Sequence, residues 1–195
     1  GFYCVYNGPE GLRRAAETAH LATATVARAL EAMDYRLASK EFFDTLEVSA
    51  EAAVVQSLAL ESGINFYYPT EGSVRMSFDE VTTPEEVAEV IRIFAAAKGR
   101  KAKAVKPVTE SNVPAGLRRR SAYLTEPVFN AYRSESALMR YIKQLELRDI
   151  SLANSMISLG SCTMKLNAAA LMQPLSLAGF QNMHPFAPAD QAEGY

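Results

Sequence analysis

The sequence predicts an α/β protein, because helical and extended patterns alternate along its first half. Apolar residues recur at helical spacings over residues 9–33, whereas residues 42–49 alternate in part between apolar and polar side chains, which is typical of a strand. Two further apolar runs flank the Pro-Thr-Glu-Gly-Ser sequence at residues 69–73, as in a β-hairpin. The predicted order of helix, strand, helix, hairpin and helix makes a small α/β domain over residues 1–98.

Local signals mark where these helices begin and end. Pro9 suits the first helical position, where its missing N–H has no intrahelical partner to lose. A short Ala- and Val-rich helix over residues 51–60 is expected to stop at Gly63, since glycine readily adopts the left-handed conformation that follows a helix. Thr83-Pro-Glu-Glu86 is a capping box with proline at the first helical position, and Gly99 is expected to end the helix that this box opens.

A basic linker is expected over residues 99–122. From Lys98 to Arg120 the chain has eight basic residues, one acidic residue and little apolar periodicity. A solvated linker is the main interpretation, and a basic docking site, including a nucleic-acid module, is the alternative. The segment has no interleaved aromatic residues that could stack on bases, which argues against the alternative.

The remaining residues, 123–195, are predicted to be less regular. They combine an extended arm at residues 124–129, a helix at residues 135–147 and a short Ala-rich helix that ends near Pro174. The sheet on which such elements would pack is missing from the sequence. We therefore expect long irregular stretches and exposed apolar surface here, whereas residues 1–98 can bury a modest core.

Composition and charge exclude several classes of protein. The chain has 49% hydrophobic and 22% charged residues and a net charge of −2, so no overall field draws it to nucleic acid or to a membrane. No apolar run approaches the length of a membrane span, and no secretory signal pattern opens the chain. Cys4 and Cys162 lie far apart, and free thiols in a reducing compartment are expected. Both ends look cut out of a longer protein.

The most informative stretch is the polar sequence from Met156 to Asn167. Its glycine, hydroxyl, thiol, ammonium and amide groups form a mixture that a packing element does not need, because each buried polar group requires a partner. A loop that holds a polar, anionic ligand does need such groups. The candidate pocket residues in it are Ser161, Cys162, Thr163, Lys165 and Asn167.

Four stretches of the chain together resemble one enzyme family, the glycine decarboxylase P-protein of the glycine cleavage system. They are Gly-Pro-Glu-Gly-Leu at residues 8–12, Glu-Pro-Val-Phe-Asn at residues 126–130, the polar stretch at residues 155–168, and the sequence from His184 to Tyr195. The last two are highly specific. Their order and spacing match the family along nearly the whole chain.

The resemblance implies a fragment of a fold type I, aminotransferase-like enzyme that uses pyridoxal phosphate. Residues 1–98 resemble the small C-terminal α/β domain of the first half, and residues 99–122 resemble the crossover. Residues 123–195 resemble the N-terminal arm and start of the cofactor-binding second half. The implied activity is that of a glycine dehydrogenase (decarboxylating), which releases CO2 from glycine and transfers the aminomethyl group to the lipoyl arm of the H-protein.

The family's cofactor is held by a lysine in a His-Lys-Thr motif, which the resemblance places downstream of this sequence. The chain alone is therefore expected to be inactive. The alternative is a non-catalytic assembly subunit that pairs with a lysine-bearing chain. The resemblance also implies a homodimer or a two-chain heterotetramer, located in the bacterial cytoplasm, or in mitochondria if the source is eukaryotic.

Each candidate residue has a plainer alternative. Ser161 and Thr163 bind the glycine carboxylate or phosphate, or only stabilise their loop. Cys162 lines a pocket rather than acting as a nucleophile or redox switch. Lys165 contacts an anion or forms a structural pair, because the family's Schiff-base lysine lies elsewhere. Asn167 caps the helix that follows it or reaches the ligand.

The two histidines receive different expectations. His184 is the sixth candidate pocket residue, since it lies in the family's entrance segment and its backbone before Pro185 is biased to an extended form. His20 sits in a helix among apolar neighbours and is expected to be a satisfied, partly buried side chain. No metal site is predicted, because these histidines and the two cysteines lack metal-ligand spacing.

Several positions depart from the family pattern. Tyr132 and Arg133 replace a common histidine pair, and Asn7 and Asn154 also replace frequent histidines. Leu171 stands where a glutamate is usual. The sequence Ala-Gly-Phe at residues 178–180 replaces Pro-Glu-Phe. These changes bear on whether the longer protein is a fully competent enzyme.

Overall fold

The computed structural model describes residues 1–149 and 169–194. The chain divides into two compact units, Gly1–Arg133 and Ser134–Tyr195. The first unit contains the expected α/β domain together with the segment predicted to be a linker. The candidate residues Ser161, Cys162, Thr163, Lys165 and Asn167 all lie outside the described residues.

A four-stranded antiparallel sheet organises the first unit. Leu46 and Val48 pair with Met76 and Val74 in register, and all four side chains are buried. Their neighbours along each strand face away from the core, as the two-residue period of a strand requires. The strand order is β1-β2-β4-β3, with bounds β1 (Arg36–Leu37), β2 (Thr45–Ser49), β3 (Tyr67–Thr70) and β4 (Ser73–Ser77).

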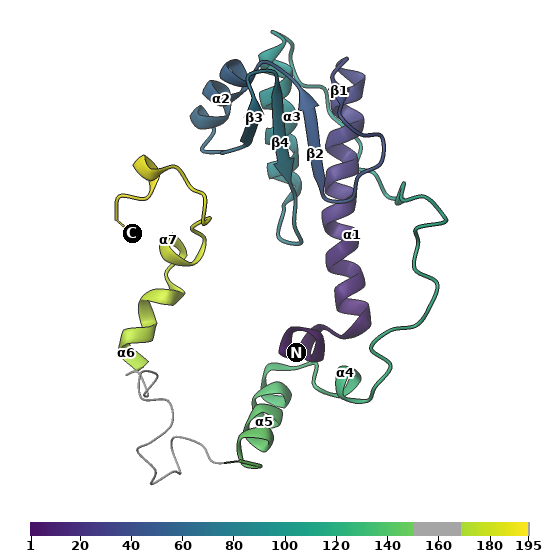
Figure 1. The fold of residues 1–195 in the computed structure, drawn as a ribbon, viewed down its shortest axis with the longest axis vertical. Coiled ribbons are helices and arrows are strands. Elements are labelled where there is room, and N and C mark those ends of the chain that lie inside the picture. The colour runs from purple at the N-terminus through teal and green to yellow at the C-terminus, as the bar shows by residue number, and fades with distance from the viewer. Residues whose placement is uncertain (150–168, 195) are drawn as a thin grey trace. The chain divides into compact units, whose positions relative to one another are not determined.

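Four helices complete the first unit: α1 (Phe2–Ala32), α2 (Ala52–Glu61), α3 (Pro84–Ala97) and α4 (Val128–Ala131). Helices α1 and α3 pack against each other, and α2 packs on α3 (Figure 1). Leu30, Ile93 and Phe94 are fully buried between these helices and the sheet. The Tyr35 hydroxyl donates to the Phe94 carbonyl at 2.8 Å, so the core is also closed by a buried hydrogen bond.

The capping box predicted for α3 is confirmed. The Thr83 hydroxyl accepts from the Glu86 amide at 3.2 Å, and the Thr83 amide donates to the Glu86 carboxylate at 2.7 Å. The helix ends where Gly99 adopts a φ of 63°. The Arg100 amide then reaches back to the Ala95 carbonyl at 2.9 Å, which satisfies a carbonyl at the C-terminal end.

Three other local predictions differ from the structure, in where a strand begins, in the conformation of an arm and in a short strand that was missed. The expected strand over residues 42–49 begins only at Thr45, because the rings of Phe42 and Phe43 lie against His20 instead. The expected arm at residues 124–129 turns helical in α4. The short strand β1 was not predicted, since two residues carry no detectable period.

The second unit has a different character. Its elements are α5 (Glu135–Glu146), α6 (Ala169–Met172), the 3-10 helix η1 (Gln173–Ser176), α7 (Ala178–Gln181) and the 3-10 helix η2 (Ala189–Gln191). None of its side chains described in the structure is buried. Large apolar side chains lie open, including Leu171 at 71% and Phe186 at 89% exposure. This agrees with the exposed apolar surface expected from the sequence.

The predicted domain limits at residues 98 and 122 stay a prediction. Residues 99–133 belong to the first unit.

Among the helices of the described residues, none combines the length and the apolar character needed to cross a membrane.

Candidate functional site

His184 is the one predicted pocket residue that the structure describes. It is exposed, and its Nδ1 accepts a hydrogen bond from the Phe186 amide at 3.0 Å. Its carbonyl accepts from the Ala187 amide at 2.9 Å, which closes a turn around Pro185. The described geometry gives His184 a local role in this turn, and its role in a pocket stays a prediction.

Helix α1 is kinked at Gly8, close to α4 and Arg133. Gly8 has φ 61° and ψ −174° and interrupts the helix before Pro9, a conformation that is essentially restricted to glycine. A Cβ atom built on Gly8 would collide with the Arg133 guanidinium and would lie 2.6 Å from the Phe129 carbonyl oxygen. The Gly-Pro sequence therefore permits both the bend and the close approach of α4.

Arg133 joins the kink to α4. Its guanidinium donates to the Asn7 carbonyl at 3.0 Å, to the Phe129 carbonyl at 2.9 Å and to the Asn130 side-chain oxygen at 2.9 Å. Two of the family-like stretches, residues 8–12 and residues 126–130, thus lie together although they are far apart in sequence. Two of the departures from the family pattern, Asn7 and Arg133, contact each other here.

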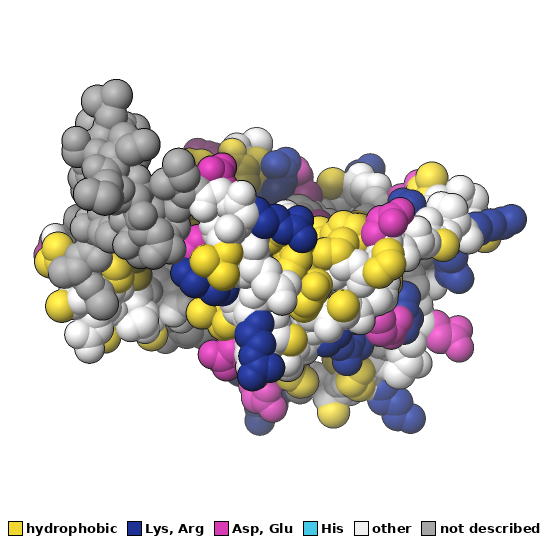
Figure 2. All heavy atoms as spheres, turned by 90° about the horizontal axis from the view of Figure 1, so that it is seen from below, with side chains coloured by type: hydrophobic (Ala, Val, Ile, Leu, Met, Phe, Trp, Pro, Cys, Tyr) yellow, Lys and Arg dark blue, Asp and Glu magenta, His cyan; other side chains and the backbone are white. Residues whose placement is uncertain are grey.

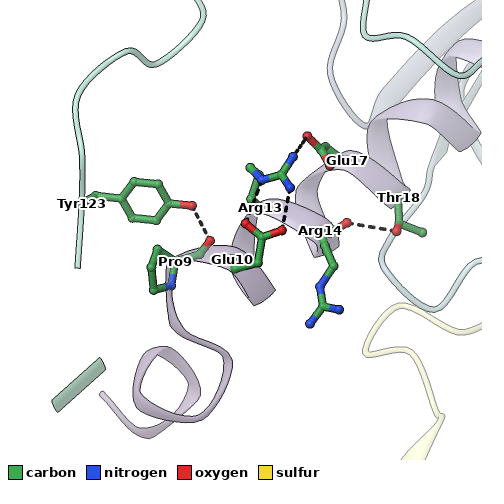
Figure 3. Close-up of polar contacts among 7 residues, drawn as sticks. All are labelled: Pro9, Glu10, Arg13, Arg14, Glu17, Thr18 and Tyr123. Atoms are coloured by element: carbon green, nitrogen blue, oxygen red, sulfur yellow. Dashed lines mark hydrogen bonds and ion pairs between the residues drawn. The ribbon is translucent and has the colours of Figure 1, made fainter. Parts of the chain in front are cut away.

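The crossover segment and Tyr123, which follows it, are hydrogen-bonded to α1 at separate points. The Val108 amide donates to the Thr25 hydroxyl at 2.9 Å, and the Arg28 guanidinium donates to the Lys106 carbonyl. Further along, the Tyr123 hydroxyl donates to the Pro9 carbonyl at 2.6 Å, across 114 positions of sequence (Figure 3). Residues 99–122 are mostly exposed, and their assignment as a linker stays a prediction. Backbone groups at residues 106 and 108 nevertheless find partners on the helix.

A cavity of about 570 Å³ lies between α1 and the crossover. Its apolar wall includes Leu12, Ala16, Leu21 and Phe43. Its polar wall includes the side chains of Arg13, Glu17, His20, Ser111, Arg119 and Tyr123. An apolar cavity with a few convergent polar groups is the usual form of a small-molecule site.

Charge on the α1 side of this cavity is locally neutralised. Arg13 donates to Glu10 at 2.6 Å and to Glu17 at 2.6 Å, and Figure 3 shows its guanidinium held between the two carboxylates. The hydrogen bond from Arg13 lowers the pKa of Glu10, and the same pairings raise the pKa of Arg13. All three side chains are largely exposed, so these ion pairs position Arg13 more than they stabilise the fold.

His20 lines the cavity from within α1. It is 2% exposed, and its Nδ1 lies 2.8 Å from the Phe43 carbonyl oxygen. Because a carbonyl only accepts, Nδ1 carries the proton and donates. Nε2 is buried without a hydrogen-bond partner among the described residues. The expected satisfied histidine is thus only half satisfied, a fact that its helical neighbours in the sequence do not reveal.

No lysine among the residues that the structure describes lines the cavity, so these residues form no Schiff-base site for pyridoxal phosphate there. Among the described residues, no group of three or more His, Cys, Asp or Glu side chains could hold a metal ion.

Comparisons with known proteins point to one family. Residues 1–94 match the model of the glycine cleavage system P-protein. The chain is 48% identical to glycine dehydrogenase (decarboxylating) of Flavobacterium johnsoniae, over 100% of this chain and 21% of that protein. It is 45% identical to the same enzyme of Thermosynechococcus vestitus, over 99% of this chain and 20% of that protein.

A solved structure of a NifS-like protein overlaps 46% of this chain and 29% of its own, with a TM-score of 0.42 and 20% identity. The chain spans about one fifth of the length of the curated relatives that it matches. The family resemblance seen in the sequence is confirmed: residues 1–94 match the model of the glycine cleavage system P-protein, and the whole chain aligns with about one fifth of a glycine dehydrogenase (decarboxylating).

Proposed function

We propose that this chain forms part of a pyridoxal-phosphate-dependent glycine decarboxylase. The reaction releases CO2 from glycine and passes the aminomethyl group to the lipoyl arm of an H-protein partner. The observation that carries this proposal is the 48% identity to a glycine dehydrogenase along the entire chain. The proposed setting is the bacterial cytoplasm, in a homodimer or a two-chain heterotetramer of fold type I architecture.

Within that enzyme, this chain supplies part of a pocket wall. The proposed contacts to the glycine carboxylate or the cofactor phosphate come from Ser161, Thr163 and Lys165, with Cys162, Asn167 and His184 beside them. Hydroxyl and ammonium groups are the donors that such anions require. When bound, the coenzyme supplies an electron sink for the electron pair left by decarboxylation.

The test is a chimaera in which this chain replaces the matching segment of the Flavobacterium johnsoniae enzyme. With pyridoxal phosphate and lipoylated H-protein present, we expect CO2 release from carboxyl-labelled glycine at a rate near that of the parent. A chimaera that folds, binds the coenzyme and releases no CO2 contradicts the proposal. That result favours the non-catalytic assembly subunit instead.

Point variants of the active chimaera test the pocket wall. Ser161→Ala and Thr163→Ala are expected to lower kcat/KM by about 10-fold to 100-fold, since each loses a hydrogen bond to a charged group. Ser176→Ala is the matched control, because its hydroxyl donates to the Gln173 carbonyl at 2.7 Å, a local hydrogen bond within the exposed 3-10 helix η1. Equal effects of all three substitutions contradict the assignment.

A further inference from the structure

The cavity between α1 and residues 109–123 contains chemistry that glycine decarboxylation does not use. Its volume of about 570 Å³ falls within the range of about 300–1,000 Å³ that is usual for sites of small organic ligands. All of its lining residues that the structure describes belong to the first unit.

Of the two arginines on the cavity wall, Arg119 is the one available to pair with an anion. The charge of Arg13 is already committed to Glu10 and Glu17. Arg119 has no carboxylate partner among the described residues: its Nε donates to the Ser121 carbonyl at 3.2 Å, and its guanidinium lies over the Tyr123 ring at 4.9 Å. The terminal nitrogens of a guanidinium held in this way favour a planar carboxylate or a phosphate.

The aromatic side chains on the cavity wall favour a ligand that contains a ring. Phe43 is 47% exposed and lies on the wall with Tyr123. Aromatic side chains prefer planar partners in stacked or edge-on contact. The Tyr123 side chain is positioned by the hydrogen bond from its hydroxyl to the Pro9 carbonyl and by the Arg119 guanidinium over its ring.

His20 adds a requirement for a hydrogen-bond donor. Nδ1 donates to the Phe43 carbonyl, so Nε2 of the neutral ring can only accept. A buried acceptor without a partner costs free energy that a ligand O–H or N–H group can recover. Nε2 is covered in the structure, so binding of the donor requires the side chains that cover it to move.

We propose that this cavity binds a small aromatic anion that carries a hydrogen-bond donor on its ring. The carboxylate or phosphate pairs with Arg119, the ring packs against Phe43 and Tyr123, and the donor reaches Nε2 of His20. This binding does not rest on the proposed decarboxylase activity, and its test measures ligand binding rather than catalysis.

The experiment titrates the 195-residue chain with 4-hydroxybenzoate and follows backbone amides and the His20 ring nitrogens by ¹⁵N NMR. We expect saturable shifts at cavity residues and a change in the Nε2 resonance as it accepts a hydrogen bond. 4-Methoxybenzoate, which keeps the anion but lacks the donor, is expected to bind about tenfold more weakly. The absence of saturable shifts at cavity residues up to about 10 mM ligand overturns the proposal.

Variants separate the two polar contacts. Arg119→Gln is expected to weaken binding of both benzoates by about tenfold or more, whereas Arg120→Gln, an exposed neighbour outside the cavity wall, leaves it unchanged. In His20→Asn the amide can still donate to the Phe43 carbonyl, but the acceptor at Nε2 is gone, so the two benzoates bind equally. An equal loss in Arg119→Gln and Arg120→Gln contradicts the anion site, and a preserved preference for the hydroxyl in His20→Asn contradicts the role of His20.

Discussion

The two units of this chain differ in how their apolar side chains are used. In the first, Leu30, Ile93 and Phe94 are completely buried in one core, and even the irregular crossover is hydrogen-bonded to α1. In the second, no described side chain is buried. Helices thus form in both units, but only the first unit contains the partner elements against which its helices bury their apolar faces.

The surface of the molecule is not uniformly polar. Seen from below, hydrophobic side chains gather in the middle of the face with Lys and Arg side chains at their border (Figure 2). At the N-terminus, Phe2, Tyr3 and Tyr6 are between 42% and 54% exposed. Exposed apolar groups of this kind mark surfaces that other protein segments cover, which agrees with a chain that spans one fifth of the length of its relatives.

The largest expected difference between the units comes from truncating apolar side chains. Phe94→Ala removes a fully buried ring that packs edge-on against Tyr35, and we expect a loss of about 3–5 kcal/mol in the free energy of unfolding. Leu145→Ala in α5 is expected to cost less than about 1 kcal/mol, since no side chain of that helix is buried. Urea unfolding followed by circular dichroism measures both, and similar losses in the two variants contradict the comparison.

The kink at Gly8 gives the next largest effect. Gly8→Ala places a Cβ atom on a backbone with positive φ and against Arg133 and Phe129, so we expect a loss of about 2–3 kcal/mol in the free energy of unfolding. Gly63→Ala, where φ is 69° and the surroundings are open, is expected to cost about 1 kcal/mol from backbone strain alone.

Gly72→Ala is the second control for the kink. Gly72 lacks a positive φ in the left-handed range and has no neighbour that a Cβ atom would meet, so its stability change is expected within about 0.5 kcal/mol of zero. If Gly8→Ala is no more costly than Gly63→Ala, the close contact between α4 and the kink is absent.

The attachment of the crossover is tested by Tyr123→Phe. This change removes the hydrogen bond to the Pro9 carbonyl and is expected to lower the free energy of unfolding by about 0.5–1.5 kcal/mol. Amide exchange over residues 109–123 is expected to accelerate at the same time. Tyr67→Phe, on a side chain that is 63% exposed, is the control and leaves both quantities unchanged, whereas unaltered exchange in Tyr123→Phe means that the crossover is not held there.

The smallest effect concerns acid stability of the first unit. Hydrogen bonds from Arg92, at 2.7 and 2.5 Å, lower the pKa of Glu89 from 4.5 to about 2. Because the folded pKa is depressed, this stabilisation is complete above pH 4.5 and is lost as the pH falls towards 2. The side chains of Arg92 and Glu89 are 54% and 32% exposed, so solvent screens the pair and it contributes less than about 1 kcal/mol.

The check is the free energy of unfolding measured between pH 2 and pH 6. Glu89→Gln is expected to flatten this profile, and Glu85→Gln, at an exposed position in α3, is expected to leave it unchanged. Identical pH profiles for the unaltered chain and Glu89→Gln contradict the assignment.

Features with local causes were predictable from the sequence. The capping box at Thr83, the stop at Gly99 and the helical period after Pro9 each depend on residues within a few positions of one another, and the structure contains all three. Helix α4 was missed because its four residues are too few to establish a period.

The candidate site was much less predictable. The contact of Tyr123 with Pro9 joins residues 114 positions apart, and that of Arg133 with Asn7 joins residues 126 apart. Only the Gly-Pro sequence at residues 8 and 9 offered a signal, because a residue before proline avoids the helical conformation. The half-satisfied state of His20 depends on the Phe43 carbonyl, 23 positions later in the chain, so no neighbouring residue indicates it.

The most direct test of the contrast between the units is residue-resolved hydrogen exchange of the 195-residue chain. Amides of α3 and β4 are expected to exchange only through global unfolding, since they surround the buried core. Amides of α5 are expected to exchange near the rate of an unstructured peptide. Protection in α5 as strong as in α3 would contradict the account, because it would show that the second unit has a core of its own.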